Sequence, residues 1–217
     1  MRLLEREHRL GLRERKKQET AERIYRTALN LFSERGYNAT TVEEIAQAAH
    51  VAKGTFFNYF PTKDAVLSYA GHRQMRLLHK AMAGDQGFEE RSVYEQLTLV
   101  FNTLAAGIQN DREAMRVVSL EVYRSVSAFS DTASSARQLY ELLLDLVRRG
   151  QGHGELRTGS ATPAESMALL VMAAYFYTFF AWLELDNPPA LALMLHVHLD
   201  LLLQGMKSTL SSADRQI

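Results

Sequence analysis

The chain has 217 residues and a mass of 24.6 kDa, with 47% hydrophobic and 23% charged residues. It is therefore long enough to bury a core, and its composition excludes a fibrous repeat or a wholly disordered chain. There is no Cys, which excludes a disulfide scaffold, a thiolate metal site and a Cys nucleophile.

The net charge of zero conceals an asymmetry along the chain. Residues 1–80 hold fifteen Lys/Arg against nine Asp/Glu, whereas residues 81–217 hold ten against sixteen. A basic first part and an acidic remainder suggest a polyanion-binding module joined to a part that does not bind the polyanion. The first seventeen residues alternate Arg and Glu and so lack the pattern of a secretory leader. We expect the protein to be cytoplasmic.

Apolar residues follow the helical period nearly everywhere, and this predicts an all-α fold of about nine helices. Residues 1–17 carry seven basic and three acidic side chains and are expected to form a mobile basic arm or an extension of the first helix. The first helix shows an apolar stripe from Ile24 to Phe32 and should stop at Gly36. Thr41 and Glu44 have the capping-box spacing and predict the start of a short second helix that ends near residue 49.

A turn over residues 51–54 precedes a third short helix, which Pro61 closes. A fourth helix should run from about residue 63 to residue 82. Longer helices are predicted over residues 89–109, 112–127, 133–150, 163–185 and 189–211. We divide the chain into an N-terminal arm (1–17), a first domain of short helices (18–64) and a second, larger helical domain (65–217).

Two short helices separated by a tight turn, over about residues 41–60, make a helix-turn-helix motif. Thr40 and Thr41 put hydroxyls and backbone amides at a helix start, where a phosphate can bind. Phe56 and Phe60 share a face and should pack against Ile24 and Ile45. The residues expected to face the groove of DNA are Lys53, Gly54, Thr55, Phe57, Asn58 and Tyr59.

The segments Thr41-Val-Glu-Glu-Ile-Ala and Val51-Ala-Lys-Gly-Thr-Phe-Phe-Asn-Tyr-Phe-Pro-Thr-Lys-Asp64 resemble the signature of the TetR family of bacterial transcriptional regulators. The resemblance covers about residues 18–70. It implies that residues 18–64 form a DNA-binding domain and that residues 65–217 form an effector-binding and dimerisation domain. It implies that Lys53, Gly54 and Phe57 approach bases. It also implies that phosphates are held by Thr41, Thr55, Tyr59 and Lys63. The family often has Tyr at the position of Phe57, so one hydroxyl contact is missing here and the target sequence is expected to differ.

One recognition helix reads too few bases for useful specificity, so we expect a homodimer on a palindromic or pseudopalindromic operator. Met167–Leu183 contains no charged residue, and 189–203 is nearly as apolar. These two helices predict a hairpin that a second copy covers, an arrangement that the resemblance also implies. The candidate interface residues are Leu170, Ala174, Tyr177, Ala181, Leu195, Leu199 and Leu202. A membrane hairpin is the alternative, but the flanking acidic residues and the lack of Lys or Arg anchors argue against it.

Aromatic and Met side chains of the second part suit an apolar pocket for a small effector, although each could equally be core. The pocket candidates are Phe101, Leu104, Ile108, Met115, Val118, Tyr123, Tyr140, Tyr175 and Phe179. Few cations occur in this stretch, so we expect an apolar or amphipathic effector. Regulation without an effector is the alternative.

No arrangement of residues indicates catalysis. Gly150, Gly152 and Gly154 follow a helix instead of opening one after a strand, so they indicate a helix stop. His196 and Asp200 would share a helix face while His198 points away, so only two ligands converge and no metal site is expected. We expect a non-enzymatic, cofactor-free regulator, most simply a repressor that an effector releases from its operator.

Overall fold

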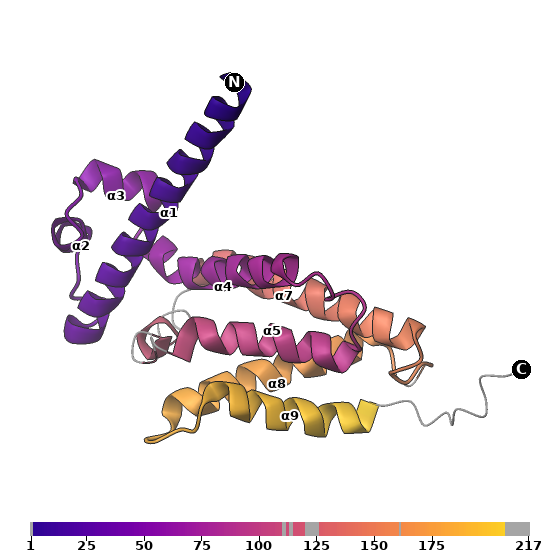
Figure 1. Ribbon diagram of the computed structural model, residues 1–217. Helices are drawn as coiled ribbons and strands as arrows, with labels where there is room; N and C mark the ends of the chain where they lie inside the picture. The colour runs from indigo at the N-terminus through magenta and orange to yellow at the C-terminus, as the bar shows by residue number, and fades with distance from the viewer. Residues whose placement is uncertain (1, 110–111, 113–114, 120–125, 161, 207–217) are drawn as a thin grey trace, which may run out of the picture. The chain divides into compact units, whose positions relative to one another are not determined.

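The computed structural model describes the backbone of residues 2–109, 112, 115–119, 126–160 and 162–206, and the side chains from residue 12 on, outside 126–133. Every regular element among these residues is a helix (Figure 1), which confirms the predicted all-α fold. The helices are α1 (Arg2–Arg35), α2 (Val42–Ala48), α3 (Lys53–Tyr59), α4 (Asp64–Gly84), α5 (Val93–Ile108), α7 (Val126–Gly152), α8 (Ala164–Glu184) and α9 (Leu191–Met206).

The chain divides into two compact units. The first comprises Met1–Ala70 and Glu113–Asp131, and the second comprises Gly71–Arg112 and Thr132–Ile217. Helix α4 begins in the first unit and continues without a break into the second.

In the first unit, α1 packs on α2 and α2 packs on α3 around a small apolar core. The core contains Ile24, Phe32, Ile45, Phe56 and Phe60, all with at most 2% of their surface exposed. Helix α1 ends where Gly36 adopts a left-handed φ of +84° and donates its N–H to the Phe32 carbonyl, as the sequence predicted. Helix α1 includes residues 2–17, so this basic segment continues the first helix, which was one of the two expectations for it.

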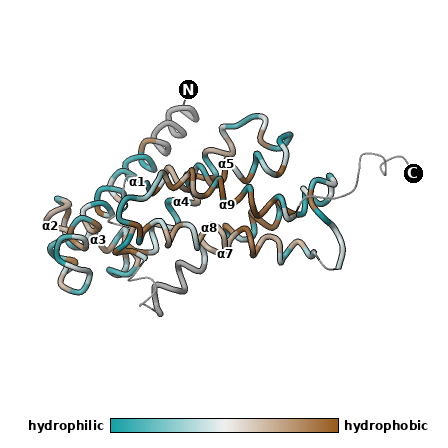
Figure 2. Tube along the Cα trace, turned by 90° about the horizontal axis from the view of Figure 1, so that it is seen from below, coloured by the Kyte–Doolittle hydropathy of each residue, from teal (hydrophilic) through white to brown (hydrophobic). Residues whose placement is uncertain are grey.

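In the second unit, α9 lies beside both α8 and α5. These helices carry long hydrophobic stretches in Figure 2. Arg112 caps the C-terminus of α8, because it donates to the carbonyls of Trp182 (3.0 Å), Leu183 (2.8 Å) and Leu185. The Trp182 indole N–H in turn donates to the Pro189 carbonyl (3.0 Å) and closes the α8–α9 turn.

The start of α5 differs from the prediction. A helix was expected from about residue 89, but residues 85–91 form turns and α5 begins at Val93. The physical reason is a second capping box, in which Ser92 and Glu95 bind each other's backbone N–H groups.

One glycine sets a close approach of helices within the second unit. A Cβ on Gly71 of α4 would lie 2.9 Å from both Cβ and Oγ of Ser135 on α7. The backbone of α4 therefore lies directly against Ser135, and a larger residue at position 71 would push the two helices apart.

Among the described residues, α8 is long and apolar enough to cross a membrane by length and composition. The core helices of soluble proteins pass the same test, and eight residues of α8 are buried within the protein.

Candidate nucleic-acid interface

Helix α2 is held at its start by the predicted capping box. The Thr41 hydroxyl accepts the Glu44 N–H (3.2 Å), and the Glu44 carboxylate accepts the Thr41 N–H (2.8 Å). The Glu44 carboxylate accepts hydrogen bonds from both the Thr41 N–H and the Thr41 hydroxyl (2.9 Å), and these two donors favour its charged form and lower the pKa of Glu44. The backbone N–H groups of Thr41 and Glu44 are consequently occupied by the protein's own side chains, while the Thr41 side chain itself is exposed.

The turn between α2 and α3 is tight and lies slightly earlier than predicted. His50 adopts a positive φ of 53°, and the Val51 N–H donates to the Ala46 carbonyl (2.9 Å). Arg23 of α1 crosses to this turn and donates to the Ala49 carbonyl (3.1 Å). The turn is therefore fixed both by its own backbone and by α1.

Helix α3 presents one face to the core and the opposite face to solvent. Phe56 and Phe60 are buried with ring centroids 5.7 Å apart, as predicted. Phe57, which lies between them in the sequence, is 43% exposed. The exposed residues are Lys53, Gly54, Phe57 and Asn58, and Thr55 and Tyr59 are half-buried.

The exposed face of α3 suits contact with base edges. A Cβ at Gly54 would meet nothing within 4 Å, so a DNA backbone or base could approach the helix there. Lys53 pairs with Glu43, and this hydrogen bond lowers the pKa of the Glu43 carboxyl. Both side chains are more than half exposed, so DNA can compete for the ammonium group.

Two residues expected at phosphates have protein partners instead. Thr40 is buried, and its hydroxyl donates to the Gly36 carbonyl (2.9 Å), so it is not available as a phosphate contact. Lys63 donates to the carbonyls of Tyr37 (2.7 Å) and Thr40 (2.9 Å). Because these bonds use two of its three N–H groups, Lys63 braces the loop before α2, with at most one N–H left for a phosphate.

The pocket candidates lie mainly in the core of the second unit. Phe101, Leu104, Ile108 and Tyr175 are buried, and the Phe101 and Tyr175 rings are 5.6 Å apart. Burial raises the pKa of the Tyr175 hydroxyl. Met115 and Val118 are also buried, Tyr140 and Phe179 are half-buried, and Tyr123 lies outside the described residues.

The second unit also contains an open groove of about 1400 Å³ between α4, α5 and the loop that joins them. None of the predicted pocket residues lines it. Its lining includes the apolar residues Leu77, Ala81 and Leu99 and the cations Arg73, Lys80 and Arg91. The carboxylates of Asp85 and Glu95 also line it, and Asp85 pairs with Arg91 at 2.9 Å. The sequence does not indicate this groove, because its residues occupy the outer faces of amphipathic helices and have the pattern of ordinary solvent-exposed positions.

The predicted dimer residues fall on two different faces. Leu195 and Leu199 are buried within the single chain and leave no surface for a partner, so the prediction that they contact one was wrong. The exposed row on α9 is Leu193, Val197 and Leu201, two residues out of register with the predicted row. On α8, Leu170 and Tyr177 are more than half exposed, Ala174 and Ala181 are half-buried, and Leu202 of α9 is half-buried too.

The polar residues of α9 have separate partners. His196 lies 3.4 Å from the Tyr94 hydroxyl, His198 lies 2.6 Å from the Thr178 hydroxyl, and Asp200 accepts from Gln204. Within the described ranges no group of three or more His, Cys, Asp or Glu residues could hold a metal ion.

The model of the family described as "Bacterial regulatory proteins, tetR family" matches residues 24–70, which span the helix-turn-helix. The HTH-type transcriptional regulator YuxN of Bacillus subtilis (strain 168) is 38% identical over 87 residues. That match covers 37% of this chain and 29% of YuxN, so the chain matches less than a third of this relative's length.

The solved structures that resemble most of the chain include two proteins that are both called FadR. The TetR-family repressor FadR of Thermus thermophilus, in complex with lauroyl-CoA, is 30% identical with a TM-score of 0.62, over 88% of this chain and 97% of that one. The regulator FadR from Bacillus subtilis, in complex with stearoyl-CoA, is 21% identical with a TM-score of 0.73, over 85% of this chain and 98% of that one. At 21% identity, the similarity to the Bacillus subtilis protein supports the fold and nothing further.

Proposed function

The chain belongs to the TetR family and is a DNA-binding transcriptional regulator, and from that premise we propose that it is a homodimeric repressor. In this proposal it binds a palindromic or pseudopalindromic operator and leaves it when a small amphipathic effector binds. The observation that carries the proposal is the outward face of α3, where Lys53, Phe57 and Asn58 are exposed although Phe56 and Phe60 are buried.

The proposed base contacts are made by this face. Lys53 supplies a cation for guanine acceptors, and the Phe57 ring supplies an apolar contact for a thymine methyl group. Asn58, Thr55 and Tyr59 add polar contacts, and Thr41 contacts a phosphate. Since a two-fold dimer places two copies of α3 about 34–36 Å apart, the half-sites should be one helical turn apart.

We assign the dimer contact to the exposed apolar rows of α8 and α9. Leu169, Leu170, Tyr177 and Phe180 on α8 and Leu193, Val197 and Leu201 on α9 expose large apolar surface. Rows of this kind on two adjacent helices favour a protein partner over solvent, and a second copy would pair the same rows by two-fold symmetry. We infer a cytoplasmic location, because that is where a bacterial operator is found.

The effector we propose is a long-chain acyl-CoA or a molecule of the same kind. The support is the lauroyl-CoA bound to the relative that is 30% identical over nearly its whole length. In the second unit, the aromatic core could receive an acyl chain, and Lys80, Arg73 and Arg91 of the groove could receive phosphates. Regulation without an effector is the competing hypothesis.

Helix α4 is the proposed connection between the effector and DNA, because it is continuous from the first unit into the second. An effector acts only through different affinities for the DNA-competent and DNA-incompetent states. To weaken operator binding about a hundredfold, it must favour the incompetent state by about 2.7 kcal/mol.

The test is selection of bound duplexes from a random-sequence library, followed by binding measurements with lauroyl-CoA. We expect an enriched palindrome, a stoichiometry of two chains per duplex, and weaker binding when lauroyl-CoA is added. Failure to retain any duplex at low ionic strength contradicts DNA binding. Unchanged affinity across saturated and unsaturated acyl-CoAs contradicts this effector class and favours regulation without it.

A further inference from the structure

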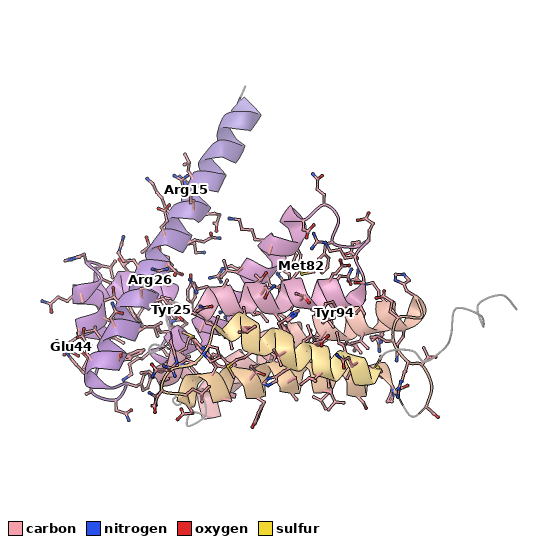
Figure 3. The ribbon with its side chains drawn as sticks, turned by 60° about the horizontal axis from the view of Figure 1, so that its bottom comes forward. Arg15, Tyr25, Arg26, Glu44, Met82 and Tyr94 are labelled. Atoms are coloured by element: carbon pink, nitrogen blue, oxygen red, sulfur yellow. The ribbon has the colours of Figure 1, made fainter. Side chains whose placement is uncertain are left out.

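The N-terminal half of α1 lies outside the segment that matches the family model. The match begins at residue 24, whereas α1 begins at Arg2. At 1.5 Å per residue, residues 2–20 add a helix of about 28 Å to the helix-turn-helix unit. Figure 1 shows these turns extending past α2 and α3, and Figure 3 places Arg15 on this extension and Arg26 on the part of α1 nearer Glu44.

Basic residues of this extension recur at one side of the helix. With 3.6 residues per turn, six of its seven Lys and Arg positions fall within an arc of about 100°. We call this set the basic stripe: Arg2, Arg6, Arg9, Arg13, Lys16 and Lys17. No acidic position falls inside the arc, and Arg15, the seventh basic residue, lies on another side and pairs with Glu19.

The stripe lies on a side of α1 next to the helix-turn-helix turn. Lys16 and Arg23 are seven residues apart, so their directions differ by only about 20°. Arg23 donates to the Ala49 carbonyl, immediately before the turn into α3. Arg13, Lys16 and Lys17 are exposed, so their charges are accessible on a side of α1 that adjoins the recognition motif.

We propose that the basic stripe is a second DNA-binding surface, which holds the phosphate backbone of duplex flanking the bases contacted by α3. This inference rests on the proposed operator binding. Six cations along about 23 Å match the charge density of a duplex, which carries one phosphate per strand about every 3.4 Å. The stripe adds affinity and salt dependence without adding base specificity.

Duplex DNA fits the stripe better than an anionic membrane does. A membrane-surface helix needs an apolar face opposite its cations. The leucines of the extension, Leu3, Leu4, Leu10 and Leu12, are spread over several sides of the helix. The stripe also lies in the same compact unit as α3.

The test compares two matched variants of the full chain, Arg13→Ala and Arg15→Ala. Each removes one exposed Arg from α1, but position 13 lies on the stripe and position 15 on nearly the opposite side. Ala preserves helix propensity, and circular dichroism checks this. The probe is the duplex that the wild-type protein enriches from a random library, either trimmed to the protected bases or extended by about one helical turn (10 bp) at each end.

On the extended duplex, log K should fall with log salt. We expect Arg13→Ala to make this slope less steep by about 0.9, and Arg13→Ala/Lys16→Ala to make it less steep by about twice that amount. Arg15→Ala should leave the slope unchanged, and trimming the duplex should abolish the difference between variants. Equal slopes for both single variants overturn the proposal. So does a loss confined to binding of phosphatidylserine vesicles. If wild type retains no duplex at all, the proposed function fails instead.

Discussion

The Lys63 ammonium nitrogen lies 4.1 Å from the centre of the Tyr37 ring, and it also donates to the Tyr37 backbone carbonyl. The Tyr37 hydroxyl in turn donates to the Asp64 carboxylate at the start of α4. Two adjacent residues, Lys63 and Asp64, therefore hold opposite ends of one tyrosine, and the loop that leads into α2 is fixed to the beginning of α4.

Replacement of Lys63 by Ala should destabilise the first unit. Hydrogen bonds from a charged donor contribute about 1.5–3 kcal/mol each, and two carbonyls would lose their partner. Since the site is half-exposed and water can replace the lysine, we expect a loss of about 1–2 kcal/mol in total. Urea unfolding measures it. Lys17→Ala, at an exposed position, serves as the control. Equal effects from the two variants would show that the hydrogen bonds of Lys63 contribute nothing to the free energy of unfolding.

Replacement of Lys53 by Ala should change DNA recognition and leave stability nearly intact. Lys53 and its partner Glu43 are both exposed, so the unfolding free energy should change by less than about 0.5 kcal/mol. Preference at one base position should relax by about 1–3 kcal/mol. Repeating the library selection with the variant measures this. Unchanged preference at every position would remove Lys53 from the base contacts.

Replacement of Thr41 by Ala should cost about 1 kcal/mol of stability, because α2 loses its N-cap. Thr41→Ser keeps the hydroxyl and should recover most of the loss. Thermal unfolding of wild type, Thr41→Ser and Thr41→Ala measures their order of stability. If Ser is no better than Ala, the methyl group and not the capping hydroxyl accounts for the stability.

The free energy of unfolding should decrease as the pH is lowered through the acid range, and part of this decrease should come from Glu44. Its folded pKa is lowered below the ordinary value of 4.5, chiefly by the Thr41 N–H and then by the Thr41 hydroxyl. A lowered folded pKa contributes stability that is present above the unfolded pKa and is lost as pH falls through the folded pKa. Glu44→Gln can still cap α2 but cannot titrate there.

We therefore expect Glu44→Gln to unfold with a shallower dependence on pH below about 4.5 than wild type does. Urea unfolding at a series of acid pH values measures the slopes. Thr41→Val removes one of the two groups that lower this pKa and should give an intermediate slope. Identical slopes for wild type and Glu44→Gln would contradict the linkage.

Replacement of Val197 by Asp should dissociate the proposed dimer, because a charge would be buried at its centre without a partner. Val197 is exposed in the single chain, so the fold itself should tolerate Asp. Sedimentation velocity measures the change in mass. Leu185→Asp introduces the same charge at another exposed apolar position, outside α8 and α9, and should leave the dimer intact. A wild-type monomer would contradict the interface from the outset.

Local signals made the first unit predictable. The Thr41–Glu44 spacing, Gly36 and the pair Phe56 and Phe60 each act over a few residues, so the sequence suffices to locate α2, the end of α1 and the buried side of α3. Lys63 shows where such reasoning stops. Its partners, Tyr37 and Thr40, are more than twenty residues away, and nothing local to Lys63 indicates that two carbonyls would converge on it.

The sequence predicted the positions of helices α8 and α9, but it did not predict which side of α9 is buried. In a helix that is apolar on every side, hydrophobic spacing does not distinguish the face packed in its own subunit from the face left exposed. Leu195 and Leu199 lie on the first face, and Val197 and Leu201 lie on the second. Only the packing of α9 against α5 and α8 decides between them.

The missing side chain at Gly71 has a consequence for how a signal could travel. A long side chain between two helices absorbs a small displacement by changing its rotamer, but at Gly71 the α4 backbone lies directly against Ser135, whose Cβ does not move when the rotamer changes. In the proposed mechanism, displacing α4 at this level displaces α7 with it. Natural variation at position 71 could therefore tune how strongly these regulators respond, while leaving every residue that binds effector or operator unchanged.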